Sequence, residues 1–154
     1  MNIVNYDDSS HRNGVVGLWD KVFGYADSRN CPSAVIDKKL AAGDGLFLVA
    51  VESGRVTGTI MAGYDGHRGW IYSLAVAPEQ RLRKIGCDLL SSAENALIQK
   101  GCMKINLQIL SSNKDVQDFY EKNGYIAEER ISMGKEIPGN IPALELCRPD
   151  IRQS

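Results

Sequence analysis

The sequence is poor in the residue clusters that build metal sites and disulfide frameworks. Its four cysteines include no Cys-x-x-Cys pair, and its two histidines, His11 and His67, lie far from any cysteine. Zinc sites and disulfide scaffolds normally show such clusters. We therefore expect no metal, and we expect scattered reduced thiols of the kind found in cytosolic proteins.

Long hydrophobic runs and an excess of charge of one sign are also missing. The longest apolar stretches, such as residues 46–51, are far shorter than the roughly 20 residues of a membrane helix. Residues 1–8 lack the basic start and apolar stretch of a secretory signal. The net charge is −1, from 18 basic and 19 acidic side chains, so no global field favours nucleic acid or an anionic membrane. These features predict a cytoplasmic protein that binds neither.

The sequence does contain an orderly succession of strand and helix patterns. With 154 residues, 44% of them hydrophobic, it is long enough for one domain with a substantial core. A first helix is expected to follow a cap at Ser9 or Ser10, and three more helices are expected at 32–40, 85–98 and 116–122. Strands are expected at 2–6, 46–52, 55–64, 70–77, 103–110, 125–128 and 131–137. This order predicts an α/β sandwich with a mixed central sheet of about seven strands, flanked by about four helices.

The most informative stretch is residues 70–86, where an apolar strand passes through a basic turn directly into an amphipathic helix. The free N–H groups and the positive dipole end of such a helix point at the turn. Arg81, Arg83 and Lys84 add positive side chains there, which suits a phosphate or pyrophosphate. The alternative is an ordinary solvated turn.

Residues 72–86 resemble the central motif of the GNAT superfamily of acetyl-CoA-dependent N-acetyltransferases. In that motif a strand of the form hydrophobic-x-Val-x-Pro precedes Arg/Gln-x-x-Gly-x-Gly/Ala and a helix. Here residues 74–78 match the strand, and Arg81 and Gly86 match the turn, whereas Lys84 stands where the first glycine is usual. A lysine is unfavourable there if the position requires a positive φ.

Residues 113–125 resemble a second signature of the same family, an asparagine followed by a helix that ends Phe/Leu-Tyr-x-x-x-Gly-Phe/Tyr. The matching residues are Asn113, Phe119, Tyr120, Gly124 and Tyr125. Two motifs in the expected order are more specific than either alone. The resemblance identifies residues 1–137 as an N-acetyltransferase domain and leaves 138–154 as a C-terminal tail. Prolines at 138, 142 and 149 predict an irregular tail, with a candidate edge segment at 143–147.

The resemblance implies an enzyme that moves acetyl from acetyl-CoA to a primary amine by direct attack. A peptide N-terminus, a lysine side chain and a small amine all remain open as acceptors, and a homodimer is possible. The family's parallel strands, here 70–77 and 103–110, splay apart to admit pantetheine. The implied coenzyme contacts are Leu74 and Val76 for pantetheine, Arg81, Leu82, Arg83, Lys84, Ile85 and Gly86 for the pyrophosphate, and Asn113 further along, unless Asn113 only caps its helix.

The chemistry needs an acid for the departing thiol and a base for the amine. Tyr120 is the candidate acid, because a phenol is protonated at neutral pH; the alternative is a core aromatic. The main-chain N–H of Val76 or a neighbour would polarise the thioester carbonyl. No carboxylate occurs in 70–77, so the base is open among Asp65 and Glu79, or a water chain ordered by Tyr72 or Ser73.

Two further alternatives follow from the same residues. The missing strand carboxylate and Lys84 favour a non-catalytic acyl-CoA-binding or regulatory module of the same fold. Trp19, Phe23 and Tyr25 are candidates for an acceptor pocket, although the helical spacing of Trp19 and Phe23 fits a buried core face better.

Overall fold

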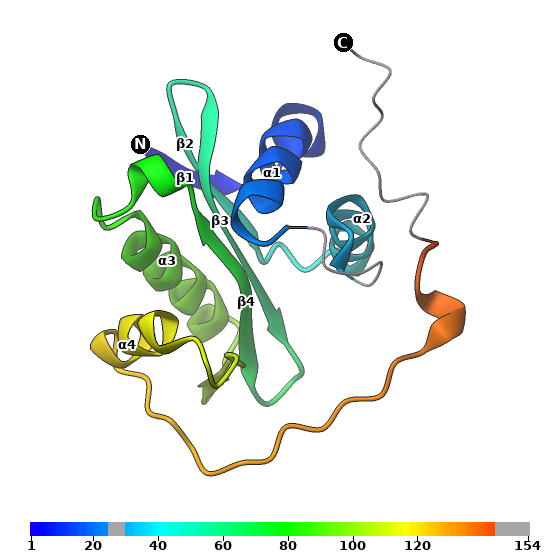
Figure 1. The fold of residues 1–154 in the computed structure, drawn as a ribbon, viewed down its shortest axis with the longest axis vertical. Coiled ribbons are helices and arrows are strands. Elements are labelled where there is room, and N and C mark those ends of the chain that lie inside the picture. The colour runs from blue at the N-terminus through cyan, green and yellow to red at the C-terminus, as the bar shows by residue number, and fades with distance from the viewer. Residues whose placement is uncertain (25–29, 144–154) are drawn as a thin grey trace.

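A computed structural model describes residues 1–24 and 30–143 of the chain. In this part of the chain five strands form one sheet in the order β1-β2-β3-β4-β5 (Figure 1). The first four strands pair antiparallel, and β5 runs parallel to β4. The strands are β1 (Asn2–Asn5), β2 (Phe47–Glu52), β3 (Arg55–Tyr64), β4 (Gly69–Val76) and β5 (Ile105–Asn106).

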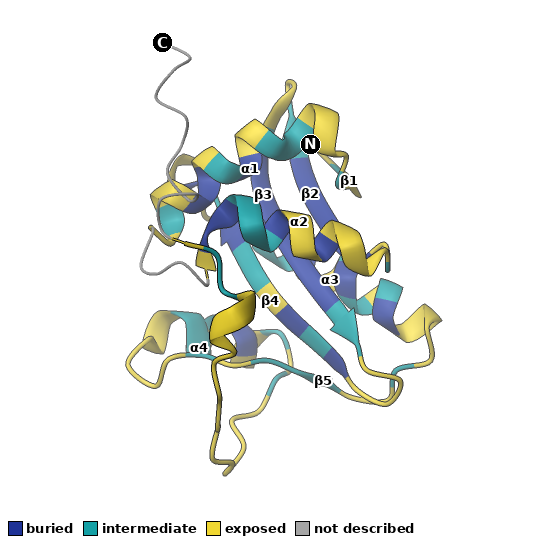
Figure 2. Cartoon of the chain, turned by 90° about the vertical axis from the view of Figure 1, so that its right-hand side faces the viewer, coloured by how far each residue is buried: buried dark blue, intermediate teal, exposed yellow. Residues whose placement is uncertain are grey.

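Four α-helices of the described residues cover the two faces of the sheet. The first two lie on one face and the last two on the other, as Figures 1 and 2 show. The helices are α1 (Asp8–Val22), α2 (Pro32–Ala42), α3 (Ile85–Gln99) and α4 (Lys114–Lys122), and two short 3-10 turns are η2 (Pro78–Gln80) and η3 (Pro138–Asn140).

The helices begin and end where the local sequence favours it, with one correction. Asp7, not Ser9 or Ser10, caps α1, because its carboxylate accepts both the Ser10 N–H at 2.9 Å and the Ser9 hydroxyl at 2.6 Å. Gly43 ends α2 at φ +60°, and Gly101 follows α3 at φ +88°, the left-handed conformation that glycine adopts readily at helix ends.

Two hydrophobic clusters, one on each face, fix the helices to the sheet. The face under α3 and α4 is built around buried Ile60, Ile71, Leu89 and Leu97. The face under α1 and α2 contains Val15, Trp19, Ile36, Phe47 and Met61. Figure 2 shows that burial concentrates along β2, β3 and the inner faces of the helices. Strand β4 of the central motif therefore lies between two packed layers.

Over residues 1–24 and 30–143 the sheet has five strands, so the predicted number of about seven is wrong. The strand expected at 103–110 shortens to Ile105–Asn106, and the hairpin expected at 125–128 and 131–137 does not form. Those hairpin residues run instead as an extended, exposed segment around the molecule (Figure 1).

The structure explains, at both ends of the segment, why the hairpin expected at 125–128 and 131–137 does not form. A two-stranded hairpin is marginal in water unless it adds to a sheet or packs on a helix. Here the neighbouring strand offers a ladder of only two residues, Gly69↔Ile105 and Trp70↔Asn106. Further along, Asn140, Ile141 and Pro142 lie against α2, which draws the chain away from the sheet edge.

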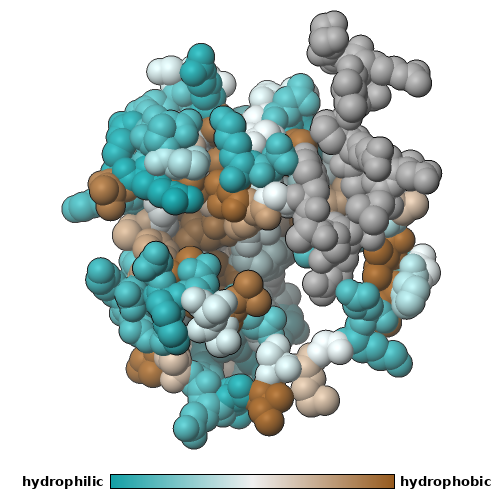
Figure 3. Space-filling view, viewed as in Figure 1, coloured by the Kyte–Doolittle hydropathy of each residue, from teal (hydrophilic) through white to brown (hydrophobic). Residues whose placement is uncertain are grey.

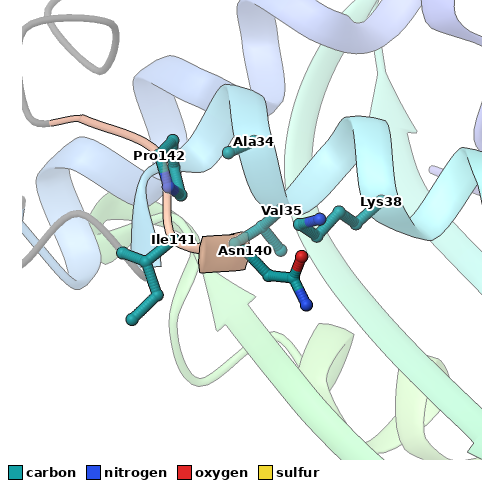
Figure 4. A pocket seen from close by; sticks show the side chains of 6 residues that line it. All are labelled: Ala34, Val35, Lys38, Asn140, Ile141 and Pro142. Carbon is teal, nitrogen blue, oxygen red and sulfur yellow. The ribbon is translucent and has the colours of Figure 1, made fainter. Parts of the chain in front are cut away.

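The contact of the tail with α2 encloses a small cavity of about 90 Å³. Figure 4 shows its lining side chains, which are Ala34, Val35 and Lys38 of α2 and Asn140, Ile141 and Pro142 of the tail. The edge segment expected at 143–147 lies, apart from Ala143, outside the described residues.

Within residues 1–24 and 30–143, the helices are all too short or too polar to cross a membrane. The cysteines of this part of the chain, Cys31, Cys87 and Cys102, are free thiols.

Candidate active site

Strand β4 is interrupted in the middle by a bulge, and this bulge is the first element of the candidate site. Thr59 of β3 lies opposite Ala75, but Met61 lies opposite Tyr72, so Ser73 and Leu74 together face Ile60. Ser73 adopts φ +53°, a left-handed conformation that a non-glycine residue adopts at a cost. Bulges of this kind redirect main-chain groups out of the ladder.

A buried hydrogen-bond relay holds the bulge in place. The Thr59 hydroxyl donates to the Ser73 carbonyl oxygen at 3.0 Å and accepts the Trp19 indole N–H at 2.8 Å. Thr59 is fully buried and Trp19 nearly so. The relay therefore fixes the bulged peptide from the α1 side of the sheet.

The other edge of β4 opens after Trp70. The ladder with β5 ends at Trp70↔Asn106, so residues 71–76 have no ladder partner on that side. Leu74 and Val76 pack with their side chains on the cluster under α3, half-buried. An extended ligand arm placed along this edge would meet main chain that has no ladder partner, as an added strand does.

The turn between β4 and α3 leads into a helix whose first N–H groups have no side-chain cap. The first helical bond runs from the Asp88 N–H to the Lys84 carbonyl at 3.0 Å. The N–H groups of Ile85, Gly86 and Cys87 precede it and have no intrahelical acceptor. No side chain caps this helix, so the groups that bind anions at a helix start are available.

Two residues of the turn hold left-handed conformations that glycine would adopt more easily. Leu82 has φ +66° and Lys84 has φ +63°, and both are exposed. The position of Lys84 thus requires a positive φ, which explains why a glycine is usual there. The turn keeps this shape in spite of the lysine.

The basic side chains of the turn are not equivalent. The Arg83 guanidinium binds both carboxylate oxygens of Glu52, at 2.8 and 2.9 Å, and also contacts Gln80. Glu52, at the end of β2, raises the pKa of Arg83 through this hydrogen bond. Arg81 and Lys84 remain exposed at the turn. Arg83 is therefore held toward β2, whereas the other two cations are available to an anion.

Gly86 lets α4 approach the start of α3. A Cβ at Gly86 would lie 3.4 Å from Phe119 and 3.6 Å from Val76. The two sequence motifs thus meet in space, one carrying the anion-binding turn and the other carrying Tyr120.

Tyr120 is buried in the cluster under α3, to which Leu74 and Val76 also belong. Its ring packs edge-on against Phe119 and Tyr125, with centroids 5.1 and 5.4 Å away. Burial raises the pKa of Tyr120 to about 12. No buried side-chain oxygen or nitrogen of the described residues lacks a partner, and no described residue bonds this hydroxyl, so it must reach solvent. Tyr120 is thus a protonated phenol with a free donor.

Asn113 is the N-cap of α4. Its side-chain oxygen accepts the Val116 N–H at 3.3 Å, and its carbonyl accepts the Gln117 N–H at 3.2 Å. The capping role, one of the two alternatives for this residue, is present in the structure. Its amide nitrogen remains for any ligand contact.

Asp65, one of the two carboxylates that flank β4, does not have the properties of a good base. Asp65 accepts the N–H groups of Arg68 and His67 at 2.6 and 2.8 Å, and these bonds lower its pKa to about 2. Glu79 is exposed in η2. A carboxylate with such a low pKa binds a proton poorly at neutral pH.

On the α2 side of β4 lies a polar cluster that the sequence did not single out. Buried Lys39 donates to Asp44 at 2.7 Å and to the Ala62 carbonyl at 2.5 Å, and its ammonium lies 5.5 Å from the Tyr72 ring centroid. Tyr72 is exposed beside this buried ion pair. Trp19 belongs to the core, Phe23 is half exposed, and Tyr25 lies outside the described residues.

Sequence reasoning missed Thr59, Lys39 and the Glu52 partner of Arg83. Thr59 and Thr57 alternate within a buried strand, which sequence analysis interprets as ordinary strand propensity. Nothing in the local pattern connects Glu52 with Arg83, 31 residues apart. Across residues 1–24 and 30–143, no three His, Cys, Asp or Glu side chains gather in a way that could hold a metal ion.

Comparison with known proteins gives one family match. The sequence model of the acetyltransferase (GNAT) family matches residues 13–125, which is most of the chain and includes both motifs.

Several solved structures share the fold at low sequence identity. One is AAC(6')-Iy in complex with a bisubstrate analog, CoA-S-monomethyl-acetylneamine, with a TM-score of 0.73, 17% identity, and coverage of 88% of this chain and 97% of that one. A second is glucosamine-6-phosphate N-acetyltransferase from Arabidopsis thaliana, with a TM-score of 0.66, 21% identity, and coverage of 88% and 97%. A third is the PaiA N-acetyltransferase from Thermoplasma acidophilum in complex with coenzyme A, with a TM-score of 0.67, 21% identity, and coverage of 84% and 92%.

Proposed function

The chain belongs to the GNAT acetyltransferase family, and on that premise we propose that it transfers acetyl from acetyl-CoA to a primary amine by direct attack. It is an acetyltransferase with acetyl-CoA as its cosubstrate. We also propose the class of the acceptor, the roles of the site residues and a cytoplasmic location.

The observation that carries the proposal is the meeting of three features around the end of β4. They are the open edge of β4 after Trp70, the uncapped start of α3 and the buried phenol of Tyr120. The open edge would receive the extended thioester arm, and the uncapped helix start would bind the diphosphate. The phenol would donate a proton to the departing thiolate.

Coenzyme binding is assigned to main chain more than to side chains. Leu74 and Val76 offer their backbone groups to pantetheine, and the turn from Arg81 to Gly86 offers its N–H groups to the pyrophosphate. Arg81 and Lys84 add charge there, whereas Arg83 shapes the turn through Glu52. Asn113 contributes its free amide nitrogen.

In the proposed reaction one bond forms, one bond breaks and every proton is accounted for. The neutral amine nitrogen attacks the acetyl carbonyl carbon, the C–S bond breaks, and the sulfur takes the Tyr120 proton. The amine proton passes to water and solvent, and Tyr120 is reprotonated in turn. A pKa of about 12 keeps Tyr120 protonated across the assay range. A main-chain N–H freed by the bulge at Ser73 would stabilise the developing oxyanion.

The lack of a base on β4 favours acceptors that lose a proton easily. An α-amino group, with a pKa of about 8, is neutral far more often at pH 7 than a lysine, at about 10.4. We therefore expect the rate to rise with pH up to the pKa of the acceptor amine. Amino sugars belong in the acceptor panel, because two structures of similar fold carry an amino sugar or its analog in their names.

The test is release of the CoA thiol from acetyl-CoA with a panel of peptides, lysine and amino sugars. Tyr120→Phe should lower kcat by about 10- to 100-fold, within the usual range for a lost general acid, with the acetyl-CoA Kd nearly unchanged. Tyr125→Phe is the matched control, because it removes a phenol that donates to Glu94 at 2.8 Å in the same cluster. Equal kcat values for Tyr120→Phe and the parent would refute the proposal that Tyr120 is the general acid.

A further inference from the structure

The end of β2 carries a carboxylate that faces the turn of residues 81–84, which joins η2 to α3. Leu48 and Ala50 of β2 belong to the cluster under α3, and Glu52 continues their row two residues further on. Glu52 therefore lies on the α3 side of the sheet. Figure 3 shows mostly hydrophilic side chains at the upper left of the molecule, where the turn projects in Figure 1.

The hairpin that carries Glu52 is bonded to the chain just before the turn. Glu52 lies opposite Arg55 at the closed end of the β2–β3 hairpin. The N–H of Ala77, which directly follows β4, donates to the Thr57 carbonyl of β3 at 2.8 Å. The hairpin and the chain that leads into the turn are therefore joined through the main chain.

The turn has a backbone shape that its own residues do not favour. Leu82 and Lys84, on either side of Arg83, have φ values of +66° and +63°. A left-handed backbone costs free energy for a residue with a Cβ, and it persists only where the surrounding structure holds it. The Leu82 side chain is fully exposed, so its packing does not offset this cost. The turn needs support from another part of the molecule.

Arg83 supplies that support. Its guanidinium donates to the two carboxylate oxygens of Glu52 at 2.8 and 2.9 Å and also contacts Gln80. Within residues 1–24 and 30–143, Arg83 is the one residue of the turn whose side chain makes a hydrogen bond or ion pair. A bond through two donors fixes both the position and the orientation of the guanidinium. The same bond lowers the pKa of Glu52, so this carboxylate is charged at neutral pH.

Given the proposed coenzyme site, on which this inference rests, we propose that Glu52 is a positioning residue of that site. It acts through Arg83 and holds the turn in the shape that binds the pyrophosphate. Arg83 is then a support of the turn and not a phosphate ligand. In the opposite case Arg83 contacts the phosphate directly, and Glu52 competes with the phosphate for the same cation. The two cases predict opposite effects when Glu52 loses its charge.

The first test is a double-mutant cycle on the acetyl-CoA Kd, measured by calorimetry with the full chain. Glu52→Gln and Arg83→Gln should each weaken binding about 3- to 5-fold, the factor that a well-oriented exposed ion pair contributes. The double variant should bind no more weakly than either single variant, because each substitution already breaks the pair. Unchanged or tighter binding by Glu52→Gln, or additive effects in the double variant, would overturn the proposal.

Asp88→Asn is the matched control for the loss of one negative charge near the turn. Asp88 is exposed in the first turn of α3, and its side chain makes no hydrogen bond or ion pair within the described part of the chain. Removing a carboxylate should by itself favour a bound anion. This variant should therefore bind acetyl-CoA at least as tightly as the parent, and a weakening equal to that of Glu52→Gln would overturn the proposal.

The second test needs no coenzyme, so it separates this proposal from the proposed function. A parent that does not bind acetyl-CoA would refute the proposed function, whereas the support of the turn is measured by chymotrypsin cleavage after Leu82 under native conditions. Glu52→Gln should raise the rate of this cleavage about 3- to 5-fold, as expected for a lost exposed ion pair. Asp88→Asn should leave the rate unchanged. Equal cleavage rates for the parent and Glu52→Gln would overturn the role of Glu52 in holding the turn.

Discussion

The Thr59 hydroxyl lies 3.0 Å from the carbonyl oxygen of Ser73 and donates to it, at the point where β4 leaves the regular ladder. Ser73 is the only residue of β4 with a positive φ. The same hydroxyl accepts the Trp19 indole N–H. A side chain of β3 thereby holds the main chain of β4 in a shape that its own sequence does not favour.

Thr59→Val keeps the shape of this side chain but removes the hydroxyl. The Trp19 N–H and the Ser73 carbonyl would both lose their partner, so the free energy of unfolding should fall by about 2 kcal/mol. Because the bulge would relax, we also expect kcat to fall with little change in the acetyl-CoA Kd. Urea unfolding and steady-state kinetics measure the two effects.

Two controls separate the bulge from general stability. Thr59→Ser keeps the hydroxyl and should retain kcat. Thr57→Val removes a buried hydroxyl that donates to the Ala50 carbonyl at 3.3 Å, away from the bulge. It should lower stability and leave kcat unchanged; an equal loss of kcat in both valine variants would argue against a special role for the relay.

At position 84 a glycine should give a more stable protein than an alanine, which reverses their usual order. At φ +63° a Cβ is unfavourable, so Lys84→Gly should be more stable than Lys84→Ala by about 0.5–1 kcal/mol. At Gly17, an exposed position inside α1 with nothing near its Cβ direction, Gly17→Ala should instead stabilise by about 1 kcal/mol. Urea denaturation of the variants decides the point, and a less stable Lys84→Gly would show that the turn tolerates a Cβ freely.

Gly58 controls how closely α3 approaches the sheet. A Cβ there would lie 2.8 Å from Leu89 and 3.1 Å from both Ile85 and the Ala75 carbonyl. Gly58→Ala should therefore destabilise the protein by about 1–3 kcal/mol through overpacking. Gly63→Ala, whose nearest contact would be Tyr72 at 3.8 Å, should be tolerated. A thermal melt that ranks the two variants equally would contradict this packing.

The Lys39–Asp44 pair should give the protein part of its acid sensitivity. Burial alone would raise the pKa of Asp44, but hydrogen bonds from Lys39 and the Leu46 N–H lower it below its ordinary value of 3.8. A lowered pKa contributes stability that is present above pH 4 and lost as the pH falls through the folded value.

Asp44→Asn tests this contribution. It should cost about 2 kcal/mol at pH 7, because Lys39 is buried and loses its partner. The difference from the parent should shrink below pH 4, where the parent protonates Asp44 as well. Urea unfolding from pH 7 to pH 3 measures it, with exposed Asp118→Asn as the control. A difference independent of pH would contradict the ionic role of Asp44.

The local chemistry of the sequence determined the central parts of this protein. The apolar strand predicted at 70–77 and the amphipathic helix predicted at 85–98 form at Gly69–Val76 and Ile85–Gln99, because their signals lie within a few residues of one another. The GNAT resemblance, given by two motifs, is confirmed by the family match. Short-range patterns of burial, capping and turn formation suffice for such features.

Only the tertiary structure decided where the sheet ends and which side chains bond to the residues of the candidate site. The residues at 131–137 alternate as a strand should, yet they form none, because a strand needs a neighbour and β5 offers a ladder of two residues. The bonds of Thr59 with Ser73 and of Arg83 with Glu52 join residues 14 and 31 positions apart. Contacts of that kind depend on which surfaces the packed layers bring together, and no local pattern in the chain records them.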